Sequence, residues 1–260
     1  MARLFRCLRE SPKNQFMLSF KRLSIGILFT GVFLFQASCT TAQITDILKQ
    51  VNSNPSTSEI TSGLKEALEK GTGISADRLS LQDGYLKNLD VKILFPEEAK
   101  QVEKTLRSIG LGSMCDQVIT SLNRAAEDAA QEAKPIFTSA IKQMSFQDVQ
   151  KILLGDKNAA TMYFKTTTTD SLSAKFSPII DSSLKKVDAT KYWSDVMTRY
   201  NKIPLVKKVD TDLTAYVTQK AINGLFLEIA KEELKIRENI SARTSPLLQK
   251  VFGYAESQKK

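Results

Sequence analysis

The chain has 260 residues, of which 42% are hydrophobic, a formal net charge of +9 and no histidine. This length and composition allow one substantial hydrophobic core. The lack of histidine excludes Ser-His-Asp and Cys-His catalysis and every His-containing metal site within the chain. Six basic residues against Glu10 give the first 38 residues a charge of +5, which leaves only +4 for the rest, and no basic stripe with interleaved aromatics appears. We therefore expect no nucleic-acid partner.

Residues 1–38 have the pattern of an export leader. A basic pair at 21–22 precedes the uncharged apolar run Leu23–Phe35, and the small-residue segment 37–39 follows it. A run of about 13 residues is shorter than the roughly 20 that span a membrane as a helix. We predict a lipoprotein-type signal peptide over residues 1–38, with Met17 as an alternative start.

The residues around the cleavage site predict how the mature chain begins. The sequence Gln36-Ala37-Ser38-Cys39 resembles a bacterial lipobox, although Gln36 stands where an aliphatic residue is usual. We predict that Cys39 is lipidated and that the protein is anchored to a membrane of the cell envelope, facing the periplasm. The alternatives are cleavage after Ala42, which gives a soluble periplasmic protein, and an uncleaved anchor.

The first helices of the mature chain are predicted to be short. An amphipathic helix is predicted over Thr40–Asn54. Ser56 and Glu59 form a capping box for the next helix, which Gly71 is expected to end. A further short helix or helical turn is expected over Asp77–Asn88. Residues 90–95 include a β-branched, roughly alternating segment with no partner strand in the sequence, which we interpret as an extended connector.

The next helix begins near Pro96 and should bury Ala99, Val102, Leu106 and Ile109. A glycine-bounded linker then leads to the stretch Met114–Met144. Apolar residues in this stretch recur at intervals of three, four or one, which predicts a helix with one buried face. Pro135 must interrupt it, so we expect two helices that meet near Lys134.

The middle of the Met114–Met144 stretch combines small apolar residues with a polar cluster. Five alanines lie on the predicted buried face: Ala125, Ala126, Ala129, Ala130 and Ala133. Around them are Asn123, Arg124, Glu127 and Asp128, which we take as the candidate polar cluster. Their spacing brings side chains together on one helix. Between helices they could fix the register or bind a polar ligand, and on the surface they would form an ion pair worth a few tenths of a kcal/mol.

The segment 145–200 is predicted to contain several short helices. Ser145 and Asp148 form a second capping box for a helix that ends at Gly155. The next helix is expected over Ala159–Phe164. The threonine run 166–169 disfavours its continuation, so a new helix, capped by Asp170, is expected after the run. That helix either kinks at Pro178 or restarts there. A further helix from Thr190 should place Tyr192, Trp193, Val196, Met197 and Tyr200 on one face, typical of a core.

The C-terminal part contains the second long helix, Leu213–Arg237. Its middle is apolar on most sides, so it should lie centrally, and Gly224 suggests a close crossing with another helix. Its charged end, from Lys231 to Glu238, is predicted to be a solvated face. Arg237 and Arg243 flank Asn239 and either bind an anionic partner or are solvated or capping residues. A final helix runs from Pro246 and should end at Gly253.

The cysteines and motifs of the chain indicate no catalytic apparatus. Cys115 is the one thiol beyond the targeting region, so no internal disulfide can form in the mature chain, and we interpret it as a packed residue. Walker, Gly-x-Ser-x-Gly and dinucleotide motifs are lacking. We therefore predict no catalytic residue, no metal site and no cofactor.

Seven stretches together resemble the bacterial DUF4197 family of domains of unknown function. They are GLKEAL at 63–68, DGYLKNLDVKILFPE at 83–97, NRAAEDAA at 123–130, AKPIF at 133–137, AATMYF at 159–164, YVTQKAINGLFLEIAKEE at 216–233 and IRENISARTSPLLQKVFG at 236–253. The resemblance covers nearly the whole mature chain. It implies an exported protein, and it supplies no established activity, cofactor or catalytic residue that could be carried over to this chain. Leucines at 89 and 94 replace prolines common in the family, a departure confined to the connector.

We predict an all-α fold, a single multi-helix bundle of roughly eight to ten helices over residues 39–260 with its core at about 43–253. The favoured function is a non-enzymatic lipoprotein of the cell envelope that binds another envelope protein or serves assembly. The alternatives are a carrier of an apolar ligand held between helices and a histidine-free, carboxylate-based hydrolase. An exposed apolar patch over a filled core would favour the interaction role. A large apolar cavity would favour the carrier, and converging carboxylates in a cleft would favour the hydrolase.

Overall fold

The computed structural model describes residues 54–258 except 203, 205–207 and 209–211, and these residues belong to the compact unit Leu48–Lys260. The described residues form nine α-helices and two 3-10 helices, with no strand, which confirms the all-α prediction. The helices are α2 (Thr57–Ser80), α3 (Lys100–Ser108), α4 (Gly112–Ala130), α5 (Ala133–Gln143), α6 (Phe146–Leu154), α7 (Ala159–Lys185), α8 (Ala189–Tyr200), α9 (Leu213–Glu238) and α10 (Pro246–Ser257), with η1 (Glu97–Ala99) and η2 (Ile240–Ala242). The leader, Cys39 and the helix predicted over Thr40–Asn54 lie outside the described residues.

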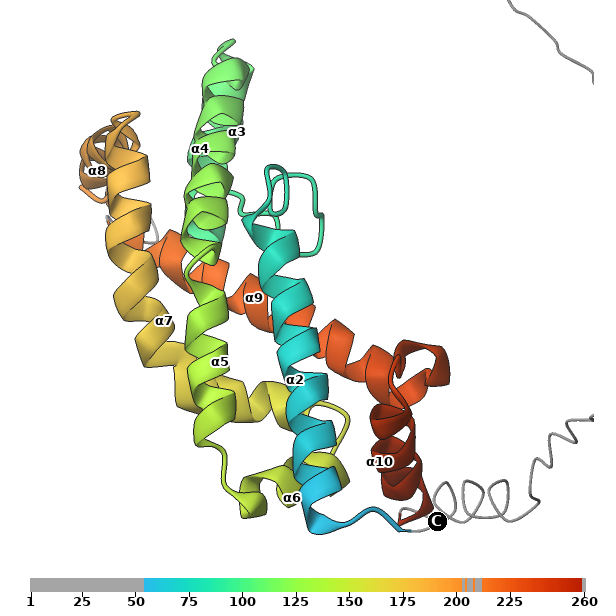
Figure 1. The fold of residues 1–260 in the computed structure, drawn as a ribbon. Helices are drawn as coiled ribbons and strands as arrows, with labels where there is room; N and C mark the ends of the chain where they lie inside the picture. Colours follow the sequence, from blue (N-terminus) through green and yellow to red (C-terminus); the bar gives the residue numbers. More distant parts are fainter. Residues whose placement is uncertain (1–53, 203, 205–207, 209–211, 259–260) are drawn as a thin grey trace, which may run out of the picture. The chain divides into compact units, whose positions relative to one another are not determined.

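Helix α9 is the central element of the bundle. It packs against α7, α2 and α4, and Figure 1 shows it crossing the other long helices. Three aromatic rings fill the interior at this crossing. The ring centroid of Phe137 on α5 lies 5.2 Å from that of Phe164 on α7 and 6.4 Å from that of Phe226 on α9. The prediction that the second long helix lies centrally is confirmed. None of the described helices is both long and apolar enough to cross a membrane.

The Met114–Met144 stretch forms two helices, α4 and α5, as predicted. The break lies at residues 131–132, so that Pro135 is in the first turn of α5. A proline is tolerated there because the first backbone N–H groups of a helix have no intrahelical partner. All five alanines of the predicted face are fully buried. Small side chains at these positions let the neighbouring helices approach closely.

The expected break at the threonine run is wrong, because α7 continues from Ala159 to Lys185 and includes Pro178. Each hydroxyl of residues 166–169 donates a hydrogen bond to the carbonyl oxygen four residues earlier, at 2.6–3.1 Å. Because each threonine hydroxyl is bonded to a carbonyl of its own helix, it does not compete for backbone groups in a non-helical conformation. The buried stripe Leu172, Phe176, Ile180 and Leu184 then holds the helix against its neighbours.

Of the three expected glycine stops, the one at Gly155 is confirmed, because α6 ends at Leu154, and the other two are wrong. Helix α2 continues through Gly71 to Ser80, and α10 continues through Gly253 to Ser257. At Gly71 an added Cβ would lie 3.7 Å from the Cβ of Glu232, so α2 and α9 approach closely there. Asp77–Ser80 belong to α2 and residues 82–87 and 89–91 form turns, so of the two alternatives for Asp77–Asn88 the structure contains turns and no separate helix. Tertiary packing outweighs the low helix propensity of glycine.

Both predicted capping boxes are present. The Ser56 and Ser145 hydroxyls accept from the backbone N–H groups of Glu59 and Asp148, and each acid accepts from the cap residue's N–H. The connector predicted over residues 90–95 is present over residues 92–96, which are neither helix nor strand, whereas residues 90 and 91 belong to the preceding turn. The helix predicted from Thr190 begins at Ala189. Its Trp193 and Met197 are buried, and the side chains of residues 192, 196 and 200 are not among those described.

Candidate functional site

Asn123 on α4 takes the place of a partner strand for the connector. Its side chain is fully buried, and its amide oxygen accepts from the Ile93 N–H at 2.8 Å. Its amide nitrogen donates to the Ile93 carbonyl at 2.8 Å and to the Ile119 carbonyl at 2.7 Å. A buried backbone segment must have its N–H and C=O groups paired. This one side chain satisfies both groups of Ile93, which explains how an extended segment is stable without a second strand.

Glu127 and Arg124 hold the turn that leads into the connector. The Oε1 atom of buried Glu127 accepts from the N–H groups of Tyr85 and Leu86 at 3.1 and 3.2 Å. Its Oε2 atom pairs with Arg124, which also contacts Asp83 at 2.6 Å. Asp83 has a φ of 70°, a strained value that these contacts stabilise. Hydrogen bonds from Lys87 and Arg124 lower the pKa of Asp83.

The predicted polar cluster is thus divided in space. Asn123, Arg124 and Glu127 contact the connector and its turn, whereas Asp128 accepts a hydrogen bond from Ser183 on α7 at 2.9 Å. All four have partners within the chain. We call the first three residues the connector clamp.

Gly224 allows the connector to lie against α9. An added Cβ would be 2.9 Å from Cε1 of Tyr85 and 3.1 Å from the Cβ of Val91. The Tyr85 hydroxyl donates to the Ala221 carbonyl at 2.7 Å, and burial raises the pKa of this phenol. The predicted close approach at Gly224 is therefore present, but its partners are Tyr85 in the turn and Val91 next to the connector, and the expected crossing with another helix is wrong there.

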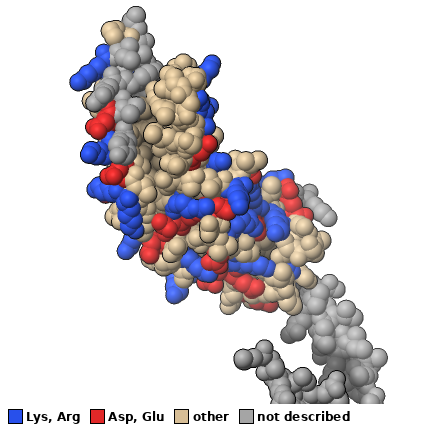
Figure 2. All heavy atoms as spheres, turned by 90° about the horizontal axis from the view of Figure 1, so that it is seen from above, with Lys and Arg blue, Asp and Glu red and all other residues tan. Residues whose placement is uncertain are grey.

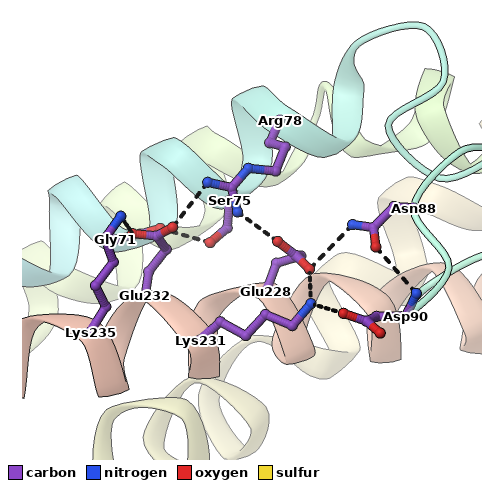
Figure 3. Close-up of polar contacts among 9 residues, drawn as sticks. All are labelled: Gly71, Ser75, Arg78, Asn88, Asp90, Glu228, Lys231, Glu232 and Lys235. Carbon is purple, nitrogen blue, oxygen red and sulfur yellow. Dashed lines mark hydrogen bonds and ion pairs between the residues drawn. The ribbon is translucent and has the colours of Figure 1, made fainter. Parts of the chain in front are cut away.

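A second polar cluster joins α2, α9 and the turns before the connector (Figure 3). Arg78 donates to Glu228 at 2.7 Å and to Glu232 at 3.0 Å. Lys231 contacts Glu228 at 2.6 Å and Asp90 at 2.5 Å. Glu228 is 2% exposed and Glu232 is 5% exposed. The solvated face predicted for the end of α9 is therefore wrong at Glu232.

The donors around Glu228 favour a structural role over acid–base catalysis. Burial raises the pKa of this carboxyl, but hydrogen bonds from Lys231, Arg78 and Asn88 outweigh burial, so the pKa lies below its ordinary value. A general acid at neutral pH needs a raised pKa instead. The sequence patterns did not single out Glu228. The feature of the sequence that could have identified it is its position between Leu227 and Ile229 in the apolar middle of a helix, because a carboxylate there requires a buried partner.

Glu233, Arg237 and Arg243 cap the ends of three helices, α7, α6 and α9 respectively. Buried Glu233 accepts from the N–H groups of residues 160 and 161 at the start of α7, both at 2.9 Å. Arg237 donates to the last carbonyls of α6, at residues 152 and 153. Arg243 donates to the carbonyls of Ile236 and Arg237 and contacts Glu256. These contacts support the capping interpretation of both arginines and correct the solvated face at Glu233.

An apolar groove has a volume of about 840 Å³. Helices α3 and α4 form one wall, and α8 with the turn that precedes it forms the other. Its apolar lining residues are Phe95, Val102, Leu106, Met114, Cys115, Val118, Val187, Ala189, Trp193 and Met197. Phe95 ends the connector, and its ring centroid lies 5.8 Å from that of Trp193. The connector clamp therefore positions one wall of the groove. Cys115 is 1% exposed, and burial raises the pKa of its thiol, as expected for a packed residue.

Charged side chains outside the groove are mixed in sign. On the face shown in Figure 2, lysine and arginine alternate with aspartate and glutamate. Many charged side chains of the domain that do not line the groove form ion pairs, for example Lys134 with Asp77 at 2.9 Å and Lys87 with Asp83 at 2.7 Å. Because that face carries no field of one charge, the apolar groove is the surface feature that we take as the candidate binding site.

These features define an all-α domain with a connector clamped against its central helices and an apolar groove on its surface. The chain belongs to the DUF4197 family, whose model, described as a protein of unknown function, matches residues 54–253. The resemblance seen in the sequence is thereby confirmed for the family itself. No curated protein and no solved structure matches the chain.

Proposed function

We propose that the mature protein is a non-enzymatic lipoprotein of the cell envelope whose groove binds an apolar segment of another envelope protein. The observation that carries this proposal is the groove of about 840 Å³ with an exposed rim, since Met114 and Val187 are each 53% exposed. Isolated exposed apolar residues are ordinary, but a contiguous apolar surface is typical of an interaction site. The protein partner is favoured because the apolar surface extends beyond the groove.

The apolar surface continues at the α3–α4 turn. Ile109, which its spacing predicts to be buried, is 66% exposed, and Leu111 is 37% exposed. Burying one side chain of this size contributes about 1.5–3 kcal/mol, so a few such contacts support a stable complex. Met114 and Met197 have flexible side chains that adapt to irregular partners. The buried floor contains Trp193, a residue type that often dominates binding energy.

Site-directed photocrosslinking tests this proposal, with two methionines as a matched pair. Met114 on the groove rim and Met162 on α7 are 53% and 50% exposed. A benzophenone amino acid at position 114 is expected to crosslink to a discrete envelope protein, and the same residue at position 162 is not. Met114→Glu should weaken binding of the crosslinked segment, made as a peptide, at least tenfold, whereas Met162→Glu should leave it unchanged. Equal crosslinking at both positions would contradict a specific groove.

A second candidate is a carrier of an apolar small molecule, favoured by the groove volume, which falls within the roughly 300–1,000 Å³ of ligand pockets. Trp193 is the sole tryptophan of the chain and lies in the groove. A dansyl-labelled fatty acid bound there would quench Trp193 emission by energy transfer, and Met114→Glu would reduce the effect. Saturable quenching at micromolar probe supports the carrier, and its absence together with peptide binding supports the protein partner.

Membrane anchoring through Cys39 is tested on the native protein. Cys39→Ser is expected to remove a diacylglyceryl mass and to release the protein from the membrane fraction. Intact mass and fractionation measure both. A wild-type mass that starts at Gln43 without lipid would contradict the anchor and leave a soluble periplasmic protein.

A further inference from the structure

Helices α7 and α9 border a second hollow, a polar furrow of about 520 Å³. It is lined by Lys165, Thr169, Ser173 and Ser177 of α7 and by Ala215, Thr218, Gln219, Ile222, Asn223 and Phe226 of α9. The α7 residues recur every four positions and form one stripe, which extends about 18 Å at 1.5 Å per residue. The furrow shares no residue with the apolar groove.

The furrow contains hydrogen-bonding groups that the rest of the described chain does not use. The side chains of Ser173, Ser177, Gln219 and Asn223 form no hydrogen bond to any described residue. Thr218 is only 6% exposed, and its Oγ1 is the sole buried side-chain N or O atom among the described residues that lacks a partner. An unsatisfied buried hydroxyl destabilises the free protein and calls for an explanation.

The chemistry of these groups indicates the class of ligand. Hydroxyls and primary amides both donate and accept, and only one charged side chain, Lys165, lines the furrow. A charged ligand would therefore lack oppositely charged side chains over most of the length of the furrow. The apolar residues of the lining are the exposed Ala215 and the mostly buried Ile222 and Phe226, which suit contact with the C–H faces of sugar rings. We infer that the α7–α9 furrow binds a neutral oligosaccharide, with Thr218 and the unused hydroxyls and amides as its hydrogen-bonding partners.

Side-chain amide signals give a direct test. The ¹⁵N-labelled domain is titrated with tri-N-acetylglucosamine and, separately, with maltotriose, while the NH₂ resonances of Gln219 and Asn223 are followed. At least one trisaccharide is expected to shift both saturably. Ser173→Leu, which fills the furrow, should weaken binding at least tenfold. Ser171→Leu, at an exposed position on the same helix, should leave it unchanged.

Thr218→Val separates the ligand role from a structural one. Valine keeps the shape and removes the unpartnered hydroxyl, so Tm should rise while trisaccharide binding weakens. A lower Tm would show that the hydroxyl already has a partner and would overturn the inference. So would the absence of shifts at millimolar trisaccharide, or shifts that Ser173→Leu does not alter. Shifts of the amide signals that depend on protein concentration, and not on trisaccharide concentration, would overturn it as well and would assign the furrow to a second copy of the chain.

Discussion

Replacing Asn123 by leucine is expected to lower the free energy of unfolding by about 3–5 kcal/mol. The substitution roughly keeps the volume but removes three hydrogen bonds, two to the backbone of Ile93 and one to the Ile119 carbonyl. It leaves a buried N–H and C=O without partners, and each unsatisfied group costs about 1–3 kcal/mol. Urea denaturation measures the change.

The connector clamp also predicts where the damage appears. Loss of the Ile93 contacts should free the connector and move Phe95 away from Trp193. The ring centroids of these two residues lie 5.8 Å apart in the wild type. Trp193 emission should therefore shift in Asn123→Leu even below the unfolding transition. Asn158→Leu is the control, because Asn158 is exposed and makes no capping hydrogen bond, and it should change stability by no more than about 0.5 kcal/mol. Wild-type stability in Asn123→Leu would show that the connector does not depend on the clamp.

Glu228→Gln is expected to lower stability by about 2–3 kcal/mol at pH 7. The wild-type carboxylate is 2% exposed and is held by Arg78, Lys231 and Asn88. Neutralising it leaves two cations without their central partner. The expected loss is below the roughly 3–5 kcal/mol of a fully buried pair, because the Arg78 and Lys231 side chains are 44% and 40% exposed and water screens them.

The same substitution should flatten the acid limb of the stability curve. The folded pKa of Glu228 is lowered from the ordinary value of 4.5, because hydrogen bonds outweigh the opposing effect of burial. A carboxylate with a lowered folded pKa stabilises the fold fully above its unfolded pKa, and this contribution is lost as the pH falls through the folded pKa. Wild type should therefore lose more stability than Glu228→Gln below about pH 4.5.

Glu238→Gln provides the matched control for this pH profile. Glu238 lies at the end of the same helix, its side chain is 49% exposed, and it pairs only at the surface with Lys157. Its variant should retain the wild-type acid limb and most of the wild-type stability. Thermal unfolding from pH 3 to pH 7 compares the three proteins. Parallel curves for wild type and Glu228→Gln would show that this buried cluster does not set the acid response.

Short-range signals were sufficient for several elements. The Ser145–Asp148 capping box, the break before Pro135 and the buried alanine face all depend on residues within a turn or two of one another. Helical periodicity therefore specified the fold class and the central position of α9. The connector was also predictable, because its β-branched residues lacked any partner strand.

Contacts between distant segments decide which polar groups are buried and where the groove lies. Glu228 needs Arg78, which is 150 residues away in the chain, and Glu233 caps a helix that begins more than 70 residues earlier. The threonine run and Gly71 disfavour helix locally, yet packing against α9 and its neighbours outweighs these small propensities. Whether a charge is solvated or paired, and whether an apolar stripe is covered or open, cannot be read from neighbouring residues. In this protein, local patterns in the sequence define most of the helices and their buried faces, whereas the packing of distant helices creates the ion network around the buried Glu228 and leaves the groove exposed.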